Sequence, residues 1–480
     1  MTETAKLRTA MLAALPFDTS LSGATPSLER LYVPPTHLKA LRPECQLVVG
    51  TRGVGKSVWT AALGNTALRH TLGSSVPELD QATIRIGFAE RPSLEHYPDA
   101  DTLISLIEAG RDPYQIWRAV IVSWAAELAS RPLPRSSWES TVEWLTDNPE
   151  DVAQLMQEAS QEQTRQQRYG LILFDALDRV SGDWAQMDQV VRALLRAVLW
   201  LKAYPRLSAK VFLREDQLER TVSDFPDASK LLATQAELSW AHHDLHGLLW
   251  QHLINAPDEH GDCLRDAYAG VVGSLPPYRE RHHELHDDAK RDSHVQRRLF
   301  ALLAGPWMGR DRRRGVPYTW IVSHLADGQA RTSPRSFLAA IRQAAEDTAE
   351  RYPKHSYALH YESIKRGVRK ASEIRVNELA EDYAWVKGVL IPLAGLSVPI
   401  AFETIRQQWE SRFPGGVDSV STAGQLPPQH QALGWNGVKD DLLRVGIFEQ
   451  RRDGRIDMPD LYRVGFGLGR KGGIKPRSRP

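Results

Sequence analysis

The segment that most constrains the fold runs from Val48 to Leu63 and reads VVGTRGVGKSVWTAAL. A short apolar run stops at Gly50, and after two more glycines Lys56 and Ser57 open a stretch with apolar residues at helical spacing. Glycines allow the backbone to curl until successive N–H groups face one point, and the following helix adds its positive N-terminal end there. The segment therefore predicts a phosphate-binding loop between a buried strand and a helix.

The spacing of these residues matches the pattern G-x-x-x-x-G-K-[ST]. The alternative is a chance glycine turn, but the flanking strand and helix are what the phosphate-binding arrangement requires. Lys56 is expected to reach the β- and γ-phosphates of ATP, and Ser57 to bind Mg²⁺. The residues predicted to contact the nucleotide are Gly50, Thr51, Arg52, Gly53, Val54, Gly55, Lys56, Ser57 and Val58.

A second motif, LILFDALD, supplies the acid that a magnesium site needs. Asp175 follows a run of apolar residues, so we expect it at the carboxyl edge of a sheet, where ligands bind in open α/β folds. It would hold Mg²⁺ through water. Asp178, three residues further on, is expected to orient or activate the attacking water, or alternatively to cap a helix N-terminus.

Further apolar segments predict the remainder of a sheet. Strands are expected at residues 45–50, 82–90, 169–180, 208–216 and 236–240, and residues 57–72 are expected to be helical. Strands that alternate with helices favour a parallel sheet covered on both faces. The predicted fold class is α/β, with a parallel five-stranded P-loop NTPase sheet followed by a helical lid and a winged-helix domain.

The C-terminal part changes in pattern. GVKDDLLRV predicts a helix closed by Gly446, and residues 447–458 predict a hairpin that turns at Asp453-Gly454. Helices followed by a two-stranded hairpin are typical of a winged helix. The predicted domains are a P-loop NTPase core with an N-terminal leader at 1–240, a helical lid at 241–350, a helical and winged-helix domain at 351–470, and a basic tail at 471–480.

The two motifs and the implied strand order resemble the AAA+/STAND branch of P-loop NTPases, and FDALDR is similar to the acidic motif of its NACHT-type members. The resemblance covers residues 30–350. It implies that Arg214, at the end of the strand KVFLRED, senses the γ-phosphate. It also implies that Arg335, beside Pro334 at the start of a lid helix, is a second sensor. The alternative for Arg335 is a solvated helix residue.

The sequence departs from this branch at two points. Ala176 stands where many AAA+ enzymes carry a catalytic glutamate, which argues against rapid hydrolysis and leaves Asp178 as the substitute. No arginine finger is evident in the sequence, and Arg179 and Arg220 are the candidates for that role.

Three functions remain open at this stage. The resemblance implies an ATP-driven switch, the ATPase component of a bacterial multi-protein system such as phage defence, working as a homo-oligomer or with an effector protein. The alternative is a DNA-binding AAA+ ATPase of the initiator or transposition-helper type, whose wing arginines Arg451, Arg452 and Arg455 would grip DNA. The third is a nucleotide-stabilised scaffold that hardly turns over.

The composition of the chain limits its possible binding partners and its cellular compartment. The net charge of +1 draws the chain to neither nucleic acid nor membrane, so any basic surface must be local. The segment GRDRRRG at 309–315 is such a surface, although a solvated loop is the alternative. Two distant cysteines indicate a reducing compartment. No apolar run approaches the roughly 18 residues of a membrane helix, so we expect a cytoplasmic protein.

Overall fold

The computed structural model describes residues 2–17, 25–181, 183–218, 221–421 and 425–470. These residues form two compact units. The sheet unit consists of residues 25–26 and 33–239, and the helical unit consists of residues 2–17, 27–32 and 240–470. The predicted basic tail at 471–480 lies outside the described residues.

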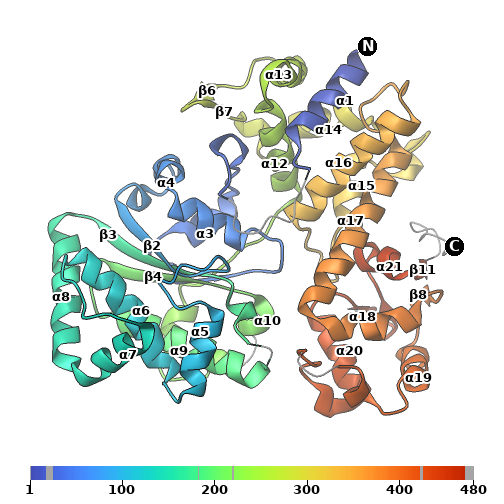
Figure 1. Cartoon of the computed structure of the whole chain (residues 1–480). Helices are drawn as coiled ribbons and strands as arrows, with labels where there is room; N and C mark the ends of the chain where they lie inside the picture. Colours follow the sequence, from blue (N-terminus) through green and yellow to red (C-terminus); the bar gives the residue numbers. More distant parts are fainter. Residues whose placement is uncertain (1, 18–24, 182, 219–220, 422–424, 471–480) are drawn as a thin grey trace. The chain divides into compact units, whose positions relative to one another are not determined.

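The sheet unit is built on a five-stranded sheet in the order β2-β3-β4-β1-β5. Strands β2, β3 and β4 are labelled in Figure 1. Its strands are β1 (Leu47–Val49), β2 (Ala82–Phe88), β3 (Tyr169–Phe174), β4 (Leu207–Leu213) and β5 (Ala236–Glu237). Every neighbouring pair is parallel, so the carboxyl ends of all the strands lie at one edge. This sheet confirms the predicted α/β fold class.

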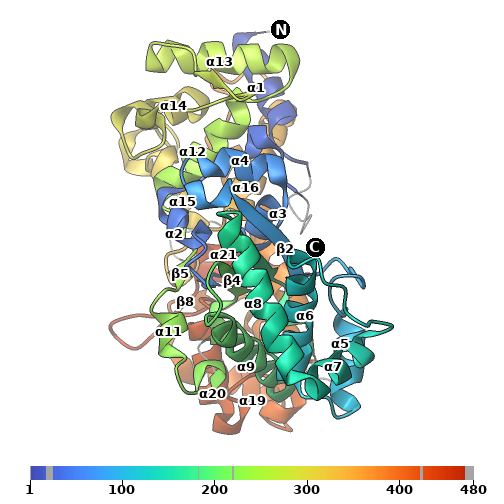
Figure 2. The same ribbon diagram turned by 90° about the vertical axis from the view of Figure 1, so that its left-hand side faces the viewer.

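Helices cover both faces of the sheet. On one face α3 (Lys56–Gly64) contacts β2, and on the other face α6 (Pro113–Leu128), α8 (Pro149–Arg165) and α9 (Trp184–Leu201) contact the strands (Figures 1 and 2). The remaining helices of this unit are α2 (Leu38–Leu41), α4 (Thr66–Gly73), α5 (Ala100–Glu108), α7 (Trp138–Asp147), α10 (Glu215–Leu218) and α11 (Ser229–Leu232).

An aromatic cluster joins these helices to the sheet. The ring of Trp117, on α6, meets the rings of Phe88 and Phe174 edge to face, with centroid distances of 5.5 Å and 5.6 Å. Its indole N–H donates to the carbonyl oxygen of Val190 on α9 at 3.0 Å, so the buried ring keeps a hydrogen-bond partner. The cluster therefore fixes α6 and α9 against the ends of β2 and β3, where Asp175 follows.

The helical segment predicted over 57–72 forms two helices, α3 and α4, because the chain restarts its helix at Asn65. This residue has φ −95° and ψ 123°, and its side-chain oxygen accepts the N–H of Leu68 at 3.1 Å as the N-cap of α4. Asparagine is among the preferred N-cap residues, since its short side chain satisfies a free N–H of the first turn. The capping signal therefore interrupts an otherwise helical pattern.

The helical unit ends in a winged helix. Its elements are α19 (Phe402–Arg412), α20 (Gly434–Arg444), β9 (Glu449–Gln450) and β10 (Ile456–Asp457). Strands β9 and β10 pair antiparallel and form the wing. Ile400, just before α19, forms an isolated antiparallel bridge with Ile456 on β10, so a third segment lies beside the two strands. The predicted hairpin is confirmed, with Gly454 at φ +81°, and α20 ends before Gly446, at φ +73°.

The other helices of this unit are α1 (Glu3–Ala14), α12 (His242–Ile254), α13 (Asp258–Val272), α14 (His294–Ala304), α15 (Pro317–His324), α16 (Pro334–Arg351), α17 (Tyr361–Asp382), α18 (Ala384–Leu390) and α21 (Asp460–Phe466). Two short pairs complete it, β6 (Tyr278–Arg279) with β7 (His282–His283) and β8 (Ser397–Val398) with β11 (Gly469–Arg470). None of the helices in the described ranges is long and apolar enough to span a bilayer.

The N-terminal helix α1 packs against α13 and α16. Nε of Arg8 donates to the carbonyl oxygen of Ala358 at 2.9 Å, and Nη1 of Arg342 donates to that of Leu12 at 2.9 Å. These bonds tie the leader to elements far along the chain. Residues 2–17 therefore lie in the helical unit, whereas the sequence grouped them with the core at 1–240.

A buried lysine ties the segment before β1 to the neighbouring strand. Lys210, on β4, is 0 % exposed, and its ammonium donates to the backbone carbonyls of Ala40 (2.7 Å), Arg42 (2.9 Å) and Cys45. Burial lowers the pKa of Lys210 to about 8. The ammonium satisfies carbonyl groups that would otherwise be buried without a donor.

We expect Lys210→Met to lower the free energy of unfolding by about 2–4 kcal/mol, because buried carbonyls lose their donor. Urea denaturation followed by tryptophan fluorescence measures the change. The control is Lys202→Met, at an exposed lysine of the same unit whose ammonium meets the carbonyl of Lys230 at 3.2 Å. It should change the free energy by less than about 0.5 kcal/mol. Equal losses in the two variants would contradict this role of Lys210.

Candidate phosphate-binding site

The loop between β1 and α3 needs its glycines for two reasons. Gly53 and Gly55 have φ values of +78° and +113°, in the region that favours glycine. At Gly50 the reason is space, because a Cβ there would lie 2.7 Å from Cγ1 of Val54 and 3.3 Å from Cβ of Leu238. The loop therefore combines a backbone curl with close packing at its base.

Lys56 is the first residue of α3, and its side chain folds back over the loop. Nζ donates to the carbonyl oxygens of Gly50 at 2.8 Å and Thr51 at 3.0 Å. Burial, with a smaller contribution from the charge of Arg214, lowers the pKa of Lys56 to about 8, although nearby carboxylates act in the opposite direction. The ammonium and the N-terminus of α3 thus bring positive charge to the same loop.

Ser57 and Asp175, far apart in the sequence, meet at the carboxyl edge of the sheet. Asp175 follows β3, where its N–H donates to the carbonyl oxygen of Phe88 at 2.9 Å, and its carboxylate lies close enough to the hydroxyl of Ser57 for this group to favour the ionised form. The side chain is buried, and this burial raises the pKa of Asp175, with the Ser57 hydrogen bond partly opposing it. Mg²⁺ prefers oxygen ligands, so this pair fits a magnesium site.

Asp178 and Arg214 form an ion pair beside Lys56. Nη1 of Arg214 lies 3.2 Å from Oδ2 of Asp178, within the short turn η4 (Leu177–Arg179) that follows β3. Burial opposes the ionisation of Asp178, but the charges of Arg214 and Lys56 outweigh it and hold the pKa of this carboxyl below its ordinary value. The two predicted catalytic residues are therefore in direct contact.

The backbone between the two acids is strained. Ala176 has φ +58° and ψ 29°, a left-handed conformation that residues with a Cβ rarely adopt. Such outliers concentrate at functional sites, where the surrounding structure holds them. The turn at Ala176 separates Asp175, which meets Ser57, from Asp178, which meets Arg214. No feature of the sequence predicts this strain.

One residue of the site escapes sequence reasoning. Oδ1 of Asp216 accepts from Nε of Arg214 at 3.1 Å, so Arg214 lies between two carboxylates. The signal that could have identified Asp216 is its place in KVFLRED, two residues after Arg214 at the end of a strand.

The remaining predicted contacts are distributed as follows. Arg52 and Val54 lie in the loop, where Val54 is buried, and Val58, on the first turn of α3, is 42 % exposed. Arg220 lies outside the described residues, and so does the side chain of Arg179.

Arg335, the predicted second sensor, belongs to the helical unit. It is the second residue of α16, after Pro334. Its Nη1 lies 2.8 Å from Oε1 of Glu378 on α17, and the other oxygen of Glu378 lies 3.3 Å from Nη1 of Arg375. A role of Arg335 toward a nucleotide stays a prediction.

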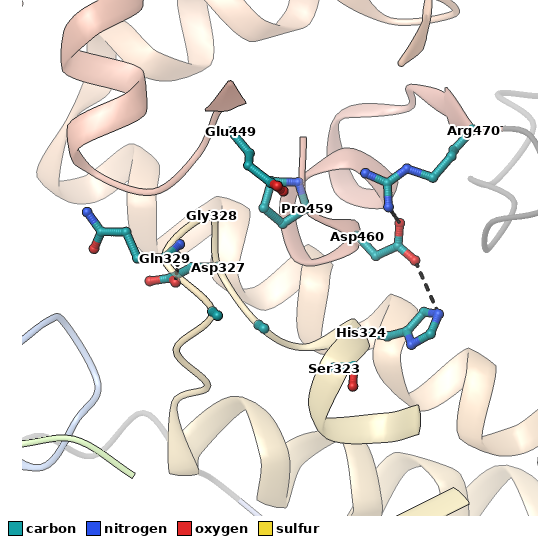
Figure 3. Close-up of a pocket in the computed structure, with 11 residues that line it drawn as sticks. Ser323, His324, Asp327, Gly328, Gln329, Glu449, Pro459, Asp460 and Arg470 are labelled. Atoms are coloured by element: carbon teal, nitrogen blue, oxygen red, sulfur yellow. Dashed lines mark hydrogen bonds and ion pairs between the residues drawn. The ribbon is translucent and has the colours of Figure 1, made fainter. Parts of the chain in front are cut away.

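A pocket of about 550 Å³ lies within the helical unit, between the turn after α15 and the winged helix (Figure 3). Its charged groups are already paired. Oδ2 of Asp460 lies 3.7 Å from Nε2 of His324, and Oδ1 lies 3.4 Å from Nη1 of Arg470. The N–H of Gly328 donates to the carbonyl oxygen of Gly446 at 2.7 Å. These contacts connect the segment after α15 to the winged helix, and the pocket lies between these two parts of the helical unit.

The parallel sheet, the glycine loop after β1 and the C-terminal hairpin have the arrangement of a P-loop NTPase fold followed by a winged helix. No protein-family profile matches the sequence, and no curated protein matches it either. Similar solved structures include an ORC2 protein of Aeropyrum pernix in ADPNP-ADP complexes, at 11% identity over 87% of this chain and 84% of that chain, with a TM-score of 0.38. The ORC1 protein of Aeropyrum pernix in complex with DNA matches at 13% identity over 94% and 93%, with a TM-score of 0.35.

The electrostatics of the site predict how Lys56 titrates. Arg214→Gln should raise the pKa of Lys56 above about 8, because it removes a neighbouring positive charge, and Asp178→Asn should lower it, because it removes a favourable negative charge. Competitive labelling with an amine-reactive reagent across pH 6–10, read by mass spectrometry, measures both shifts, with exposed Lys202 as the reference. Identical titrations in all three proteins would contradict the arrangement.

Proposed function

We propose that this chain is an ATP-binding protein of the AAA+ type that acts as a Mg²⁺-dependent switch and hydrolyses ATP slowly. The observation that carries the proposal is the meeting of two motifs, in which the buried carboxylate of Asp175 lies close enough to Ser57 and Lys56 for both to lower its pKa, beside a loop covered by Lys56. These groups lie at the carboxyl edge of a parallel sheet, where ligands bind in such folds.

Each group has a distinct task in this proposal. The loop at 50–55 and the N-terminus of α3 would hold the phosphates. Lys56 would exchange its carbonyl acceptors, on Gly50 and Thr51, for phosphate oxygens. Ser57 and Asp175 would hold Mg²⁺, which neutralises developing charge in phosphoryl transfer. The raised pKa of Asp175 supports this assignment, since a bound cation would keep the buried carboxyl group ionised.

Two features support slow turnover. A general base works best when its pKa is near the working pH, whereas Arg214 and Lys56 hold the pKa of Asp178 low. Asp178 is therefore better suited to orient a water molecule than to remove its proton. The neighbouring position that many AAA+ enzymes use for a glutamate is Ala176, which offers no side-chain oxygen.

DNA binding, as in an initiator or a transposition helper, is a second candidate function. The observation that favours it is the winged helix, in which α20 precedes the hairpin and Ile400 completes the strand arrangement. The wing itself offers little free charge, because Arg451 pairs with Asp457, and Arg455 lies 2.7 Å from Asp453. Roles in phage defence, a homo-oligomer and an effector partner stay predictions.

We expect Lys56→Ala to abolish the thermal stabilisation of the protein by Mg-ATP. At a concentration of about 100 times Kd, Mg-ATP should stabilise the unaltered protein by about 2.7 kcal/mol, which appears as a rise in Tm. Lys230→Ala, at an exposed lysine of the same unit, should keep the full rise. A full rise in Lys56→Ala would contradict the assignment of the phosphate loop.

Asp178→Asn should slow ATP hydrolysis by about 10²-fold while Mg-ATP still raises Tm, because the variant keeps the residues that hold phosphate and metal. A single-turnover measurement with protein in excess over ATP separates the chemical step from product release. Asp224→Asn, at an exposed aspartate of the same unit, is the control and should hydrolyse at the unaltered rate. If Asp178→Asn kept that rate as well, Asp178 would have no part in the reaction.

A further inference from the structure

Residues 309–315, which lie within the connection between α14 and α15 (305–316), carry an unusual concentration of positive charge and are called the basic loop below. The flanking residues of this connection include the half-buried Trp307 and Val316, which is 39 % exposed. Four of the seven residues of the basic loop are arginines, Arg310, Arg312, Arg313 and Arg314, and each of them is exposed. Within the described ranges no carboxylate forms an ion pair with any of the four. Their charge is therefore available to a partner.

The loop carries one acidic residue, Asp311, and its side chain has an internal task. Oδ1 of Asp311 accepts the backbone N–H of Arg313 at 2.9 Å and so caps the short turn η7 (Arg312–Arg314). This hydrogen bond orders the turn that presents the arginines. The loop keeps a clear excess of positive charge, with four arginines against one aspartate.

The loop is ordered at both ends. The N–H of Met308 donates to the carbonyl oxygen of Gly315 at 2.8 Å and closes the loop, while the N–H of Gly315 donates to the carbonyl oxygen of Arg312 at 3.1 Å. Gly309 and Gly315 have φ values of +148° and +96°, which allow the chain to turn there. A surface ordered before binding loses less conformational entropy when it binds.

The wing differs from the basic loop because two of its arginines form ion pairs with nearby carboxylates. The segment 449–457 contains three arginines and three acidic residues, and within it Arg451 forms an ion pair with Asp457 and Arg455 forms one with Asp453. The wing is therefore close to neutral. If the helical unit binds a polyanion, the basic loop is better suited to bind its phosphate groups than the wing is.

The composition of the basic loop indicates the class of partner. Arginine presents a planar fork of donors that matches phosphate oxygens. The loop has no aromatic side chain on which unpaired bases could stack, as they do on single-strand-binding surfaces. It also has no apolar side chain to form the buried core of a protein–protein interface. Closely spaced guanidinium groups without either feature suit the dense phosphates of a duplex.

We propose that the basic loop binds the phosphate backbone of double-stranded DNA, without reading the bases. The proposal does not depend on nucleotide binding, because none of the residues assigned to the phosphate site lies in the loop. It assigns DNA contact to a connection between two helices of the helical unit and not to the wing.

The test measures binding of the full chain to a fluorescently labelled 25-base-pair duplex by anisotropy, between 50 and 200 mM KCl. In the variant R310Q/R312Q/R313Q/R314Q we expect Kd at 50 mM salt to rise at least about 10-fold. The slope of log K against log salt should fall by about 3–4, since each lost phosphate contact removes about 0.9. The variant with four lysines should keep most of the slope, because it keeps the charge. All variants are checked for stabilisation by Mg-ATP, so that misfolding or failure of the proposed ATP site is detected separately.

The matched control is the wing variant R451Q/R452Q/R455Q, which should reduce the slope by less than about 1. The proposal is overturned if the unaltered protein does not bind the duplex or if the four-glutamine variant binds it equally well. It is also overturned if the wing variant removes binding that the loop variant keeps. Tighter binding to a 25-nucleotide single strand, or to labelled polyglutamate that duplex DNA does not displace, would identify a different partner and overturn it too.

Discussion

The place of β1 between β4 and β5 decides where the polar side chains of the site can lie. The N–H of Gly50 donates to the carbonyl oxygen of Leu213 on β4 at 3.1 Å, and the N–H of Leu238, after β5, donates to that of Val49 at 2.8 Å. The base of the loop is therefore held from both sides before its glycines begin to turn. Because the neighbouring strands are parallel, Asp175 and Arg214 emerge at the same edge.

Strands β1 and β3 could be predicted because each is an apolar run followed by a glycine or a charged residue, and β2 could be predicted because apolar and polar residues alternate in part of it. The break at Asn65 could have been predicted too, since asparagine is a known cap, but the apolar spacing on either side of it suggests one helix. The position of α1 could not, because Arg8 contacts Ala358 far along the chain and no local pattern records that packing. Buried Lys210 likewise depends on carbonyls that only the fold brings together.

The charge of the surface could be predicted less completely, because the sequence shows how many charged residues a segment contains but not which of them form ion pairs in the fold. The arginines near the hairpin suggested a basic wing, yet residue 449 pairs with residue 457 across the turn, and this register places Arg451 beside Asp457. A hairpin register can be worked out from the position of its turn, so this neutralisation was accessible in principle. The pairing of Arg335 with Glu378 was not, because it joins two separate helices.

The charges of the phosphate site also explain how binding and chemistry would be linked. In the structure, Arg214 and Lys56 hold the pKa of Asp178 low, and Arg214 is shared with Asp216. A triphosphate would compete with Asp178 for both cations and would place further negative charge near it. Both effects would raise the pKa of Asp178 from the low value that it has in the free site. Nucleotide binding would release this carboxylate from Arg214 and Lys56, so that it could orient the water molecule as proposed above.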